Sequence, residues 1–439
     1  MKFIQLTGSI VATGVTAYMN EIKKALLEEG HEVETYFCKA NNKEETNAAN
    51  LSPGIKKFNY TQAEIDHINS CDYVLVHSLM GATYKEYADE FNELLQYKIT
   101  TKKVLFLNAH YKRHYAFFGL ELFENRDYIN SFDYICNFSP DSEICNLLKE
   151  TIGSEFYNKY INIYHPISFD DNLKKSWLPL SEKKKRVTYI GRYASAKKPW
   201  QILNMCKHDT AHEFEYEMRG IEKMIGVVSV PDLFYTIDTS KTYPSLKDAI
   251  KGDSQYTTYI SNKWREEHGV SEDDLLIDYP RTDNKMFIFG PYKREDGMEA
   301  MRASMFGLEC HSPKKINANR DEKSLIPAML FEYAMAEIIM TGTIPIFDTA
   351  IGRNLYVLDK TTNKEKTLYE MKMGIFLNEN DSNMDDVMTQ MREYANNEKL
   401  YNTMRETLWD YYKDHTDPAK VIRYFIKQLT TERKKIGLF

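Results

Sequence analysis

Residues 1–37 read MKFIQLTGSIVATGVTAYMNEIKKALLEEGHEVETYF, and this stretch decides the fold class. The apolar run at residues 2–7, which leads into a glycine-containing loop, predicts a buried strand. Apolar side chains then recur at helical spacing across residues 15–29, and Gly30 ends the predicted helix. Residues 32–37 form the next predicted strand. A strand, a helix and a strand in succession indicate a parallel β-α-β unit.

The same alternation continues along the chain in two series. Apolar runs typical of strands buried on both faces form the first series at residues 73–77, 104–108, 132–137 and 160–164. After a polar stretch near residue 180, a second series predicts strands at residues 186–192, 214–220, 286–291, 344–347 and 374–377. Helices are predicted at residues 382–410 and 419–435.

We therefore expect an α/β protein with two Rossmann-like domains that face each other across a cleft. The first predicted domain spans residues 1–178. The second spans residues 183–415, with an insertion at about residues 227–285, and residues 416–439 form a helix that packs back on the first domain. Ligands of such sheets bind at the carboxyl ends of the strands, and clefts between domains are preferred ligand sites.

The bulk composition excludes several classes of protein. A chain of 439 residues, 43% hydrophobic and 28% charged, is long enough for two cores and is not disordered. Its net charge of −7 disfavours a protein that coats DNA by charge alone, while a local basic groove remains compatible with it. Six scattered cysteines without metal-binding spacing favour free thiols in the cytoplasm. No apolar run reaches the roughly 18–20 residues of a membrane span.

A glycine turn at the end of a predicted strand carries two cations, because residues 191–197 read GRYASAK. Arg192 and Lys197 could stabilise the charge of a diphosphate leaving group without a metal ion. An ordinary polar turn with two surface cations explains these residues equally well. Because convincing Asp-x-Asp loops are absent from the sequence, we expect no metal.

A second candidate site reads EYAMAEIIMTGTIPI at residues 332–346. The pattern predicts a helix that ends at Gly342, and a carboxylate on it, Glu337, could accept both hydroxyls of a ribose. Glu332 lies about 140° around the same helix from Glu337, so a regular helix cannot point both glutamates at the same ligand, and one of them could be structural. A solvated position on the outer helix face is the alternative for Glu337.

Weaker candidates lie at other predicted strand ends. Gly14, Val15 and Thr16 begin a helix, where backbone N–H groups favour an anion. Arg219-Gly220 and Asn108-Ala109-His110 follow strands, and His110 could act as a base or orient an acceptor hydroxyl. Tight turns explain these residues as well. The sequence has no P-loop, GxSxG, HExxH or GxGxxG motif that would favour other chemistry.

Taken together, these residues resemble the retaining glycosyltransferases of the GT-B class. Residues 191–197 match their Gly-Arg-x-x-x-x-Lys signature, and residues 337–345 match their pattern of a glutamate followed by glycine and proline. The Glu-Tyr-x-x-x-Glu spacing before Gly-Thr-Ile-Pro more narrowly resembles the T-even phage DNA α-glucosyltransferase family. Most of the chain shares this similarity, except residues 227–285.

The resemblance implies transfer of glucose from UDP-glucose to 5-hydroxymethylcytosine in duplex DNA, with retention and with the target base flipped out. This phage DNA modification would protect against host nucleases, in the cytoplasm of the bacterial host. Arg192 and Lys197 would bind the diphosphate, Glu337 the ribose, and Glu332 the donor sugar or the diphosphate. The implied donor site also includes residues at other predicted strand ends and one residue after the helix that ends at Gly342. These residues are Gly14, Val15, Thr16, Arg219, Gly220 and Thr343.

The implied catalytic group consists of Asn108, His110 and Glu332. The family has His-Asp-His where this chain has Asn108-Ala109-His110, so the aspartate is missing and the acceptor is left open. For phosphate contacts with DNA, the basic clusters suggest Lys112, Arg113 and His114, together with residues 183–186.

Three alternatives remain at this point. One is a GT-B enzyme of cell-surface polysaccharide or glycolipid synthesis, for which residues 110–118 would face a membrane. Another is a DNA glycosyltransferase that uses a pentose donor or an already glycosylated base. The third is a binding module with an inactive donor site, which the presence of Arg192, Lys197 and Glu337 disfavours.

Overall fold

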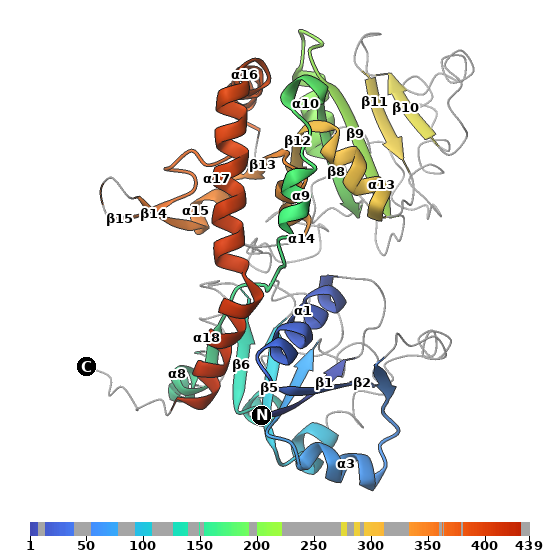
Figure 1. The fold of residues 1–439 in the computed structure, drawn as a ribbon, viewed down its shortest axis with the longest axis vertical. Coiled ribbons are helices and arrows are strands. Elements are labelled where there is room, and N and C mark those ends of the chain that lie inside the picture. The colour runs from blue at the N-terminus through green and yellow to red at the C-terminus, as the bar shows by residue number, and fades with distance from the viewer. Residues whose placement is uncertain are drawn as a thin grey trace. The chain divides into compact units, whose positions relative to one another are not determined.

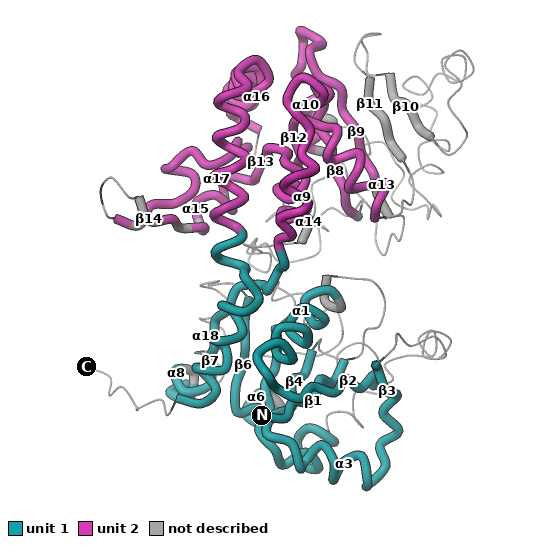
Figure 2. Tube along the Cα trace, in the orientation of Figure 1, with its two compact units in different colours: residues 1–168, 323–332, 413–439 teal, residues 169–322, 333–412 magenta. Residues whose placement is uncertain are grey.

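The computed structural model describes residues 1–7, 14–38, 54–77, 93–107, 126–138, 149, 153–192, 200–221, 274–278, 285–289, 294–310, 333–359, 362, 364–378 and 381–431. The chain forms two compact units (Figure 2). The first contains residues 1–168, 323–332 and 413–439, and the second contains residues 169–322 and 333–412. The first stretch of the first unit therefore ends at residue 168, before the expected end of the first domain at residue 178. Phe169 and Trp177 account for this, since both rings pack on Trp409 in the second unit.

The first unit is built on a parallel sheet with the order β3-β2-β1-β4-β5-β6-β7 (Figure 1). Its strands are β1 (Lys2–Thr7), β2 (Glu32–Phe37), β3 (Ile55–Lys57), β4 (Tyr73–His77), β5 (Lys102–Leu107), β6 (Tyr134–Asn137) and β7 (Tyr160–Asn162). Its helices include α1 (Gly14–Glu28), α3 (Gln62–Asn69), α6 (Arg126–Asn130), α8 (Phe156–Lys159) and α18 (Pro418–Thr430). The strand order reverses between β1 and β4, where ligands of such sheets bind.

Helix α18 packs against α1 within this unit. Its apolar face is buried, and Arg423 on its outer face pairs with Glu29 at 2.9 Å. Asp417 caps the helix, because its carboxylate accepts a hydrogen bond from the backbone N–H of Lys420 at 2.9 Å.

The second unit has its own sheet with the order β10-β11-β9-β8-β12-β13-β16. All neighbouring strands are parallel except β10 and β11. The strands are β8 (Lys184–Arg192), β9 (Glu215–Ile221), β10 (Asp274–Asp278), β11 (Lys285–Phe289), β12 (Ser304–Glu309), β13 (Ile344–Asp348) and β16 (Ile375–Leu377). The helices include α9 (Asp171–Lys175), α10 (Trp200–His208), α13 (Arg294–Arg302), α14 (Tyr333–Met340), α15 (Thr349–Asn354), α16 (Met384–Asn396) and α17 (Glu398–Thr416).

The expected α/β architecture with two parallel-strand sheets is confirmed, with differences in detail. The prediction of one continuous helix at residues 382–410 is wrong. Two helices, α16 and α17, occupy this region, and Asn397 separates them. Its backbone is extended, and its side-chain oxygen accepts a hydrogen bond from the N–H of Leu400 at 3.0 Å, which starts a new helix. A separate hairpin of β14 (Tyr356–Asp359) and β15 (Lys364–Thr367) was not expected. Among the described residues, every helix is too short or too polar to cross a membrane.

Candidate donor site

Two adjacent strand ends in the second unit bring together residues that the sequence singled out. In the register of β8 and β9, Gly191 lies opposite Gly220 and Arg192 lies opposite Ile221. Arg192 and Arg219-Gly220 therefore share the carboxyl edge of one parallel sheet, as their positions after apolar runs predicted. Lys197 lies outside the described residues.

Acidic side chains of β9 bind the cations of these two strands. The Glu217 side chain is only 2% exposed and accepts hydrogen bonds from both Arg186 and Arg219. Arg186 also donates to Glu215 at 2.7 Å. Because Glu217 is on the same strand as Arg219, it fixes that guanidinium at the sheet edge.

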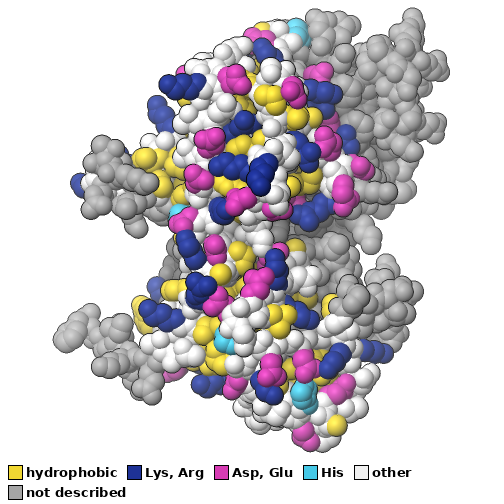
Figure 3. Space-filling model, in the orientation of Figure 1, with side chains coloured by type: hydrophobic (Ala, Val, Ile, Leu, Met, Phe, Trp, Pro, Cys, Tyr) yellow, Lys and Arg dark blue, Asp and Glu magenta, His cyan; other side chains and the backbone are white. Residues whose placement is uncertain are grey.

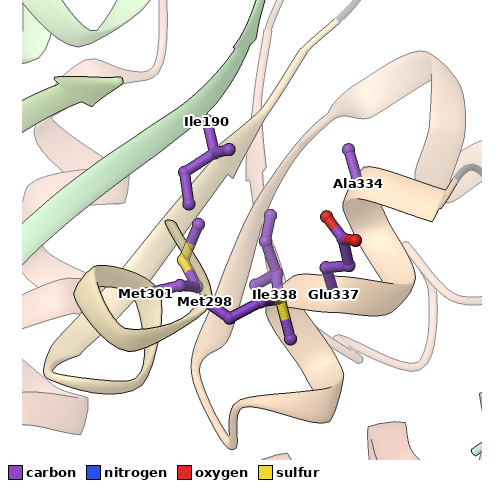
Figure 4. A pocket seen from close by; sticks show the side chains of 6 residues that line it. All are labelled: Ile190, Met298, Met301, Ala334, Glu337 and Ile338. Atoms are coloured by element: carbon purple, nitrogen blue, oxygen red, sulfur yellow. The ribbon is translucent and has the colours of Figure 1, made fainter. Parts of the chain in front are cut away.

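Glu337 lies on α14 and lines a small pocket (Figure 4). The other lining side chains are apolar and come from β8, α13 and α14: Ile190, Met298, Met301, Ala334 and Ile338. The Glu337 side chain is 23% exposed, and its Oε1 accepts a hydrogen bond from Arg294 Nε at 2.8 Å. Its place in an apolar pocket argues against a solvated position on an outer helix face.

Burial raises the pKa of Glu337, and Arg294 opposes that shift. The like charge of Glu309, at the end of β12, raises the pKa further. A carboxylate in such a pocket favours a ligand that donates hydrogen bonds to it, since each donor stabilises the ionised form. Vicinal hydroxyls of a sugar are donors of this kind.

Thr343 follows α14, but its side chain does not line the pocket. Its residue is 1% exposed, and its hydroxyl donates to the carbonyl of Met301 at 2.7 Å. The same oxygen accepts hydrogen bonds from Thr341 Oγ1 at 3.1 Å and from Lys183 Nζ at 3.3 Å. The hydroxyl joins α13 to the start of β13, and the part of Thr343 in donor binding stays a prediction.

Several other predicted site residues lie outside the described part of the chain: Asn108, His110, Lys112, Arg113, His114 and Glu332. Of Gly14, Val15 and Thr16, the structure describes the backbone, which forms the first turn of α1. Their roles stay predictions. No group of three or more potential metal ligands occurs among the residues described.

Comparison with known proteins shows which proteins this chain is similar to. A DNA alpha-glucosyltransferase of enterobacteria phage T4 is 22% identical over 417 residues, which cover 92% of this chain and 94% of that protein. The chain resembles the phage DNA α-glucosyltransferases. An alpha-glucosyltransferase solved with UDP-glucose and DNA containing an abasic site has a TM-score of 0.65 and 16% identity, covering 98% of this chain and 99% of that one. No protein-family model matches the chain.

A second group of solved structures shares the fold more distantly. The Anabaena protein HepE, solved with UDP and glucose, has a TM-score of 0.55 and 12% identity, covering 98% of this chain and 99% of that one. The resemblance predicted from the sequence is thus confirmed, and the fold is that of the GT-B glycosyltransferases.

Two polar features were not anticipated from the sequence. One is Arg294, which lies 43 residues before its partner Glu337 and belongs to no motif. The other joins three strands of the first unit: Gln5 accepts a hydrogen bond from Thr35 at 3.0 Å and contacts His77 Nε2 at 3.3 Å. Burial lowers the pKa of His77 to about 3, so this imidazole is neutral at physiological pH.

The expectation that residues 183–186 contact DNA phosphates is wrong for two of the four cations. Lys183 is 5% exposed and Arg186 is 8% exposed. The Lys183 ammonium donates to the carbonyls of Arg302 at 2.7 Å and Ser304 at 3.0 Å, while Arg186 is bound to Glu215 and Glu217. A run of charge in the sequence does not show which of its members a neighbouring strand will bury.

The burial of Lys183 predicts a pH-dependent stability. Burial lowers the pKa of Lys183 to about 7, against an unfolded value of about 10.4. Between these values the unfolded chain binds a proton that the folded chain does not, so the free energy of unfolding rises with pH. From pH 7 to pH 9 we expect this group to add about 2 kcal/mol, and Lys183→Met to abolish that increment.

Urea denaturation followed by tryptophan fluorescence checks this, because all four tryptophans lie in the second unit. Lys184→Met serves as the control, since Lys184 is adjacent and exposed. Equal pH dependence in the wild type and in Lys183→Met would contradict the prediction.

Proposed function

We propose that this chain is a UDP-sugar-dependent glycosyltransferase that moves glucose from UDP-glucose to 5-hydroxymethylcytosine in duplex DNA, with retention of configuration. One observation carries the proposal: the chain matches a phage DNA alpha-glucosyltransferase over 92% of its own length and 94% of that protein. The reaction would modify phage DNA in the cytoplasm of the bacterial host and protect it against host nucleases.

The second unit supplies most of the donor site in this proposal. The bond between the sugar C1 and the diphosphate oxygen breaks, and UDP leaves with the electron pair. Arg192 and Lys197 stabilise the charge that develops on the diphosphate. Glu337 accepts the ribose hydroxyls in its apolar pocket, while Glu332 faces the donor sugar or the diphosphate. Arg219 and Gly220 complete the same sheet edge, which the register of β8 and β9 supports.

The first unit supplies the acceptor site in this proposal. The hydroxymethyl oxygen of the flipped base bonds to C1 on the face that UDP leaves, and His110, with Asn108 beside it, takes the hydroxyl proton. Lys112, Arg113 and His114 contact the DNA phosphates. Figure 3 shows Lys and Arg interspersed with Asp and Glu on the described surface that it draws. Phosphate binding would therefore depend on a local cluster, since the net charge is −7.

The test is transfer of labelled sugar from UDP-glucose to duplex DNA, with hydroxymethylcytosine DNA and plain cytosine DNA compared side by side. We expect label in the modified DNA alone, released by an α-glucosidase and not by a β-glucosidase. Transfer from a UDP-pentose, or only to an already glycosylated base, would keep the enzyme class and correct the donor or the acceptor. Transfer to a glycan or glycolipid and to no DNA would overturn the DNA assignment.

A further inference from the structure

An exposed arginine contacts the carboxylate of the candidate donor pocket. Arg294 begins α13, and its side chain is 68% exposed, whereas the Glu337 side chain is 23% exposed. Arg294 Nε donates to Glu337 Oε1 at 2.8 Å. The arginine does not itself line the pocket, so any influence on a ligand passes through Glu337.

The helix that carries Arg294 also forms the pocket wall. Met298 and Met301 lie four and seven residues after Arg294, so all three side chains project from one face of α13. Helices α13 and α14 pack against each other, and Figure 4 shows both methionines among the side chains that line the pocket with Glu337. Helix α13 therefore supplies both part of the pocket wall and the arginine that contacts Glu337.

A carboxyl group binds ribose hydroxyls most strongly when it is ionised and when one of its oxygens points into the pocket. The charged groups that act on Glu337 are Arg294 from α13 and Glu309 from β12. Burial and Glu309 raise the pKa of Glu337, and Arg294 is the group that lowers it. Without the arginine, a larger share of Glu337 would be protonated as the pH falls.

We propose that Arg294 is a positioning residue of the donor site. Its hydrogen bond fixes Oε1 of Glu337, so that Oε2 accepts a ribose hydroxyl of the UDP-sugar. This inference rests on the proposed function, because it assumes that the pocket binds a uridine nucleotide.

Equilibrium binding of UDP to the full chain, measured by calorimetry from pH 6 to pH 8, tests the proposal. Arg294→Gln should weaken UDP binding by roughly threefold to tenfold, and more at the acidic end of this range than at the alkaline end, because loss of the guanidinium favours the protonated form of Glu337. Arg294→Lys should restore most of the affinity at pH 6, since it keeps the charge. A purely structural role for Arg294 would not produce this pH dependence or its rescue.

Arg392→Gln is the matched control. Arg392 Nε pairs with Glu213 Oε1 at 3.0 Å in the same unit, and neither residue lines the pocket. We expect this variant to bind UDP like the wild type at every pH.

A ribose analogue separates positioning of the carboxylate from a general loss of charge. The wild type should bind UDP more tightly than 2′,3′-dideoxy-UDP, and Arg294→Gln should reduce that preference. If Arg294→Gln binds UDP with the affinity and pH dependence of the wild type, the inference is overturned and the proposed function stands. If the wild type binds no UDP at any pH, both are overturned.

Discussion

Arg192→Ala and Lys197→Ala are each expected to lower kcat/KM for the UDP-sugar by about 100-fold to 1000-fold. The diphosphate gains negative charge as the sugar bond breaks, and a cation fixed near it stabilises the transition state more than the ground state. The loss should therefore appear mainly in kcat. Release of UDP from the UDP-sugar, with and without DNA, measures it directly.

Lys184→Ala is the control for this pair of variants. Lys184 and Arg192 are the two ends of β8, so the substitution removes a cation from the same strand at the edge away from the candidate site. In the absence of DNA, its release of UDP should equal that of the wild type. Wild-type turnover in both Arg192→Ala and Lys197→Ala would place the diphosphate elsewhere.

The parallel sheets could be predicted because their strands are continuous apolar runs between helices. One central strand, β12, was not predicted from the sequence, because it contains Gly307. A glycine weakens the strand pattern in the sequence, yet a side chain there is excluded by packing. A Cβ on Gly307 would lie 2.8 Å from both Ile338 and Met301, which belong to the helices that form the candidate pocket. The glycine permits the close approach of α13 and α14 to the sheet.

The candidate donor site was predictable only where its residues follow a local pattern. Arg192 and Glu337 stand at fixed distances from a glycine turn, so their positions at the sheet edge and on α14 could be inferred. The contact of Arg294 with Glu337 depends on the packing of two helices that are distant in sequence. The prediction that Arg186 contacts DNA phosphates failed for the same reason. Its guanidinium donates a hydrogen bond to Glu215, its register partner on β9, which is distant in sequence.

Gly342→Ala is expected to lower the free energy of unfolding of the second unit by about 2–4 kcal/mol. Gly342 has a φ of +66°, a left-handed conformation that costs alanine about 1 kcal/mol. A Cβ there would also lie 2.6 Å from the Trp177 ring. That ring cannot move without loss, because its Nε1 donates to the carbonyl of Met340 at 2.8 Å and Arg405 lies over it at 4.9 Å. Urea denaturation measures the change.

A double-mutant cycle with Trp177→Leu identifies the cause of that loss. If the clash with the ring is responsible, Gly342→Ala should cost only the backbone strain of about 1 kcal/mol in the Trp177→Leu background. Strictly additive effects would show that the ring is not involved. Because Trp177 bonds to Met340, the last residue of α14, displacement of the ring should also shift Glu337 and weaken UDP binding in Gly342→Ala. Stability and donor affinity would then fall together for one geometric reason: the helix that carries the pocket carboxylate ends against that indole.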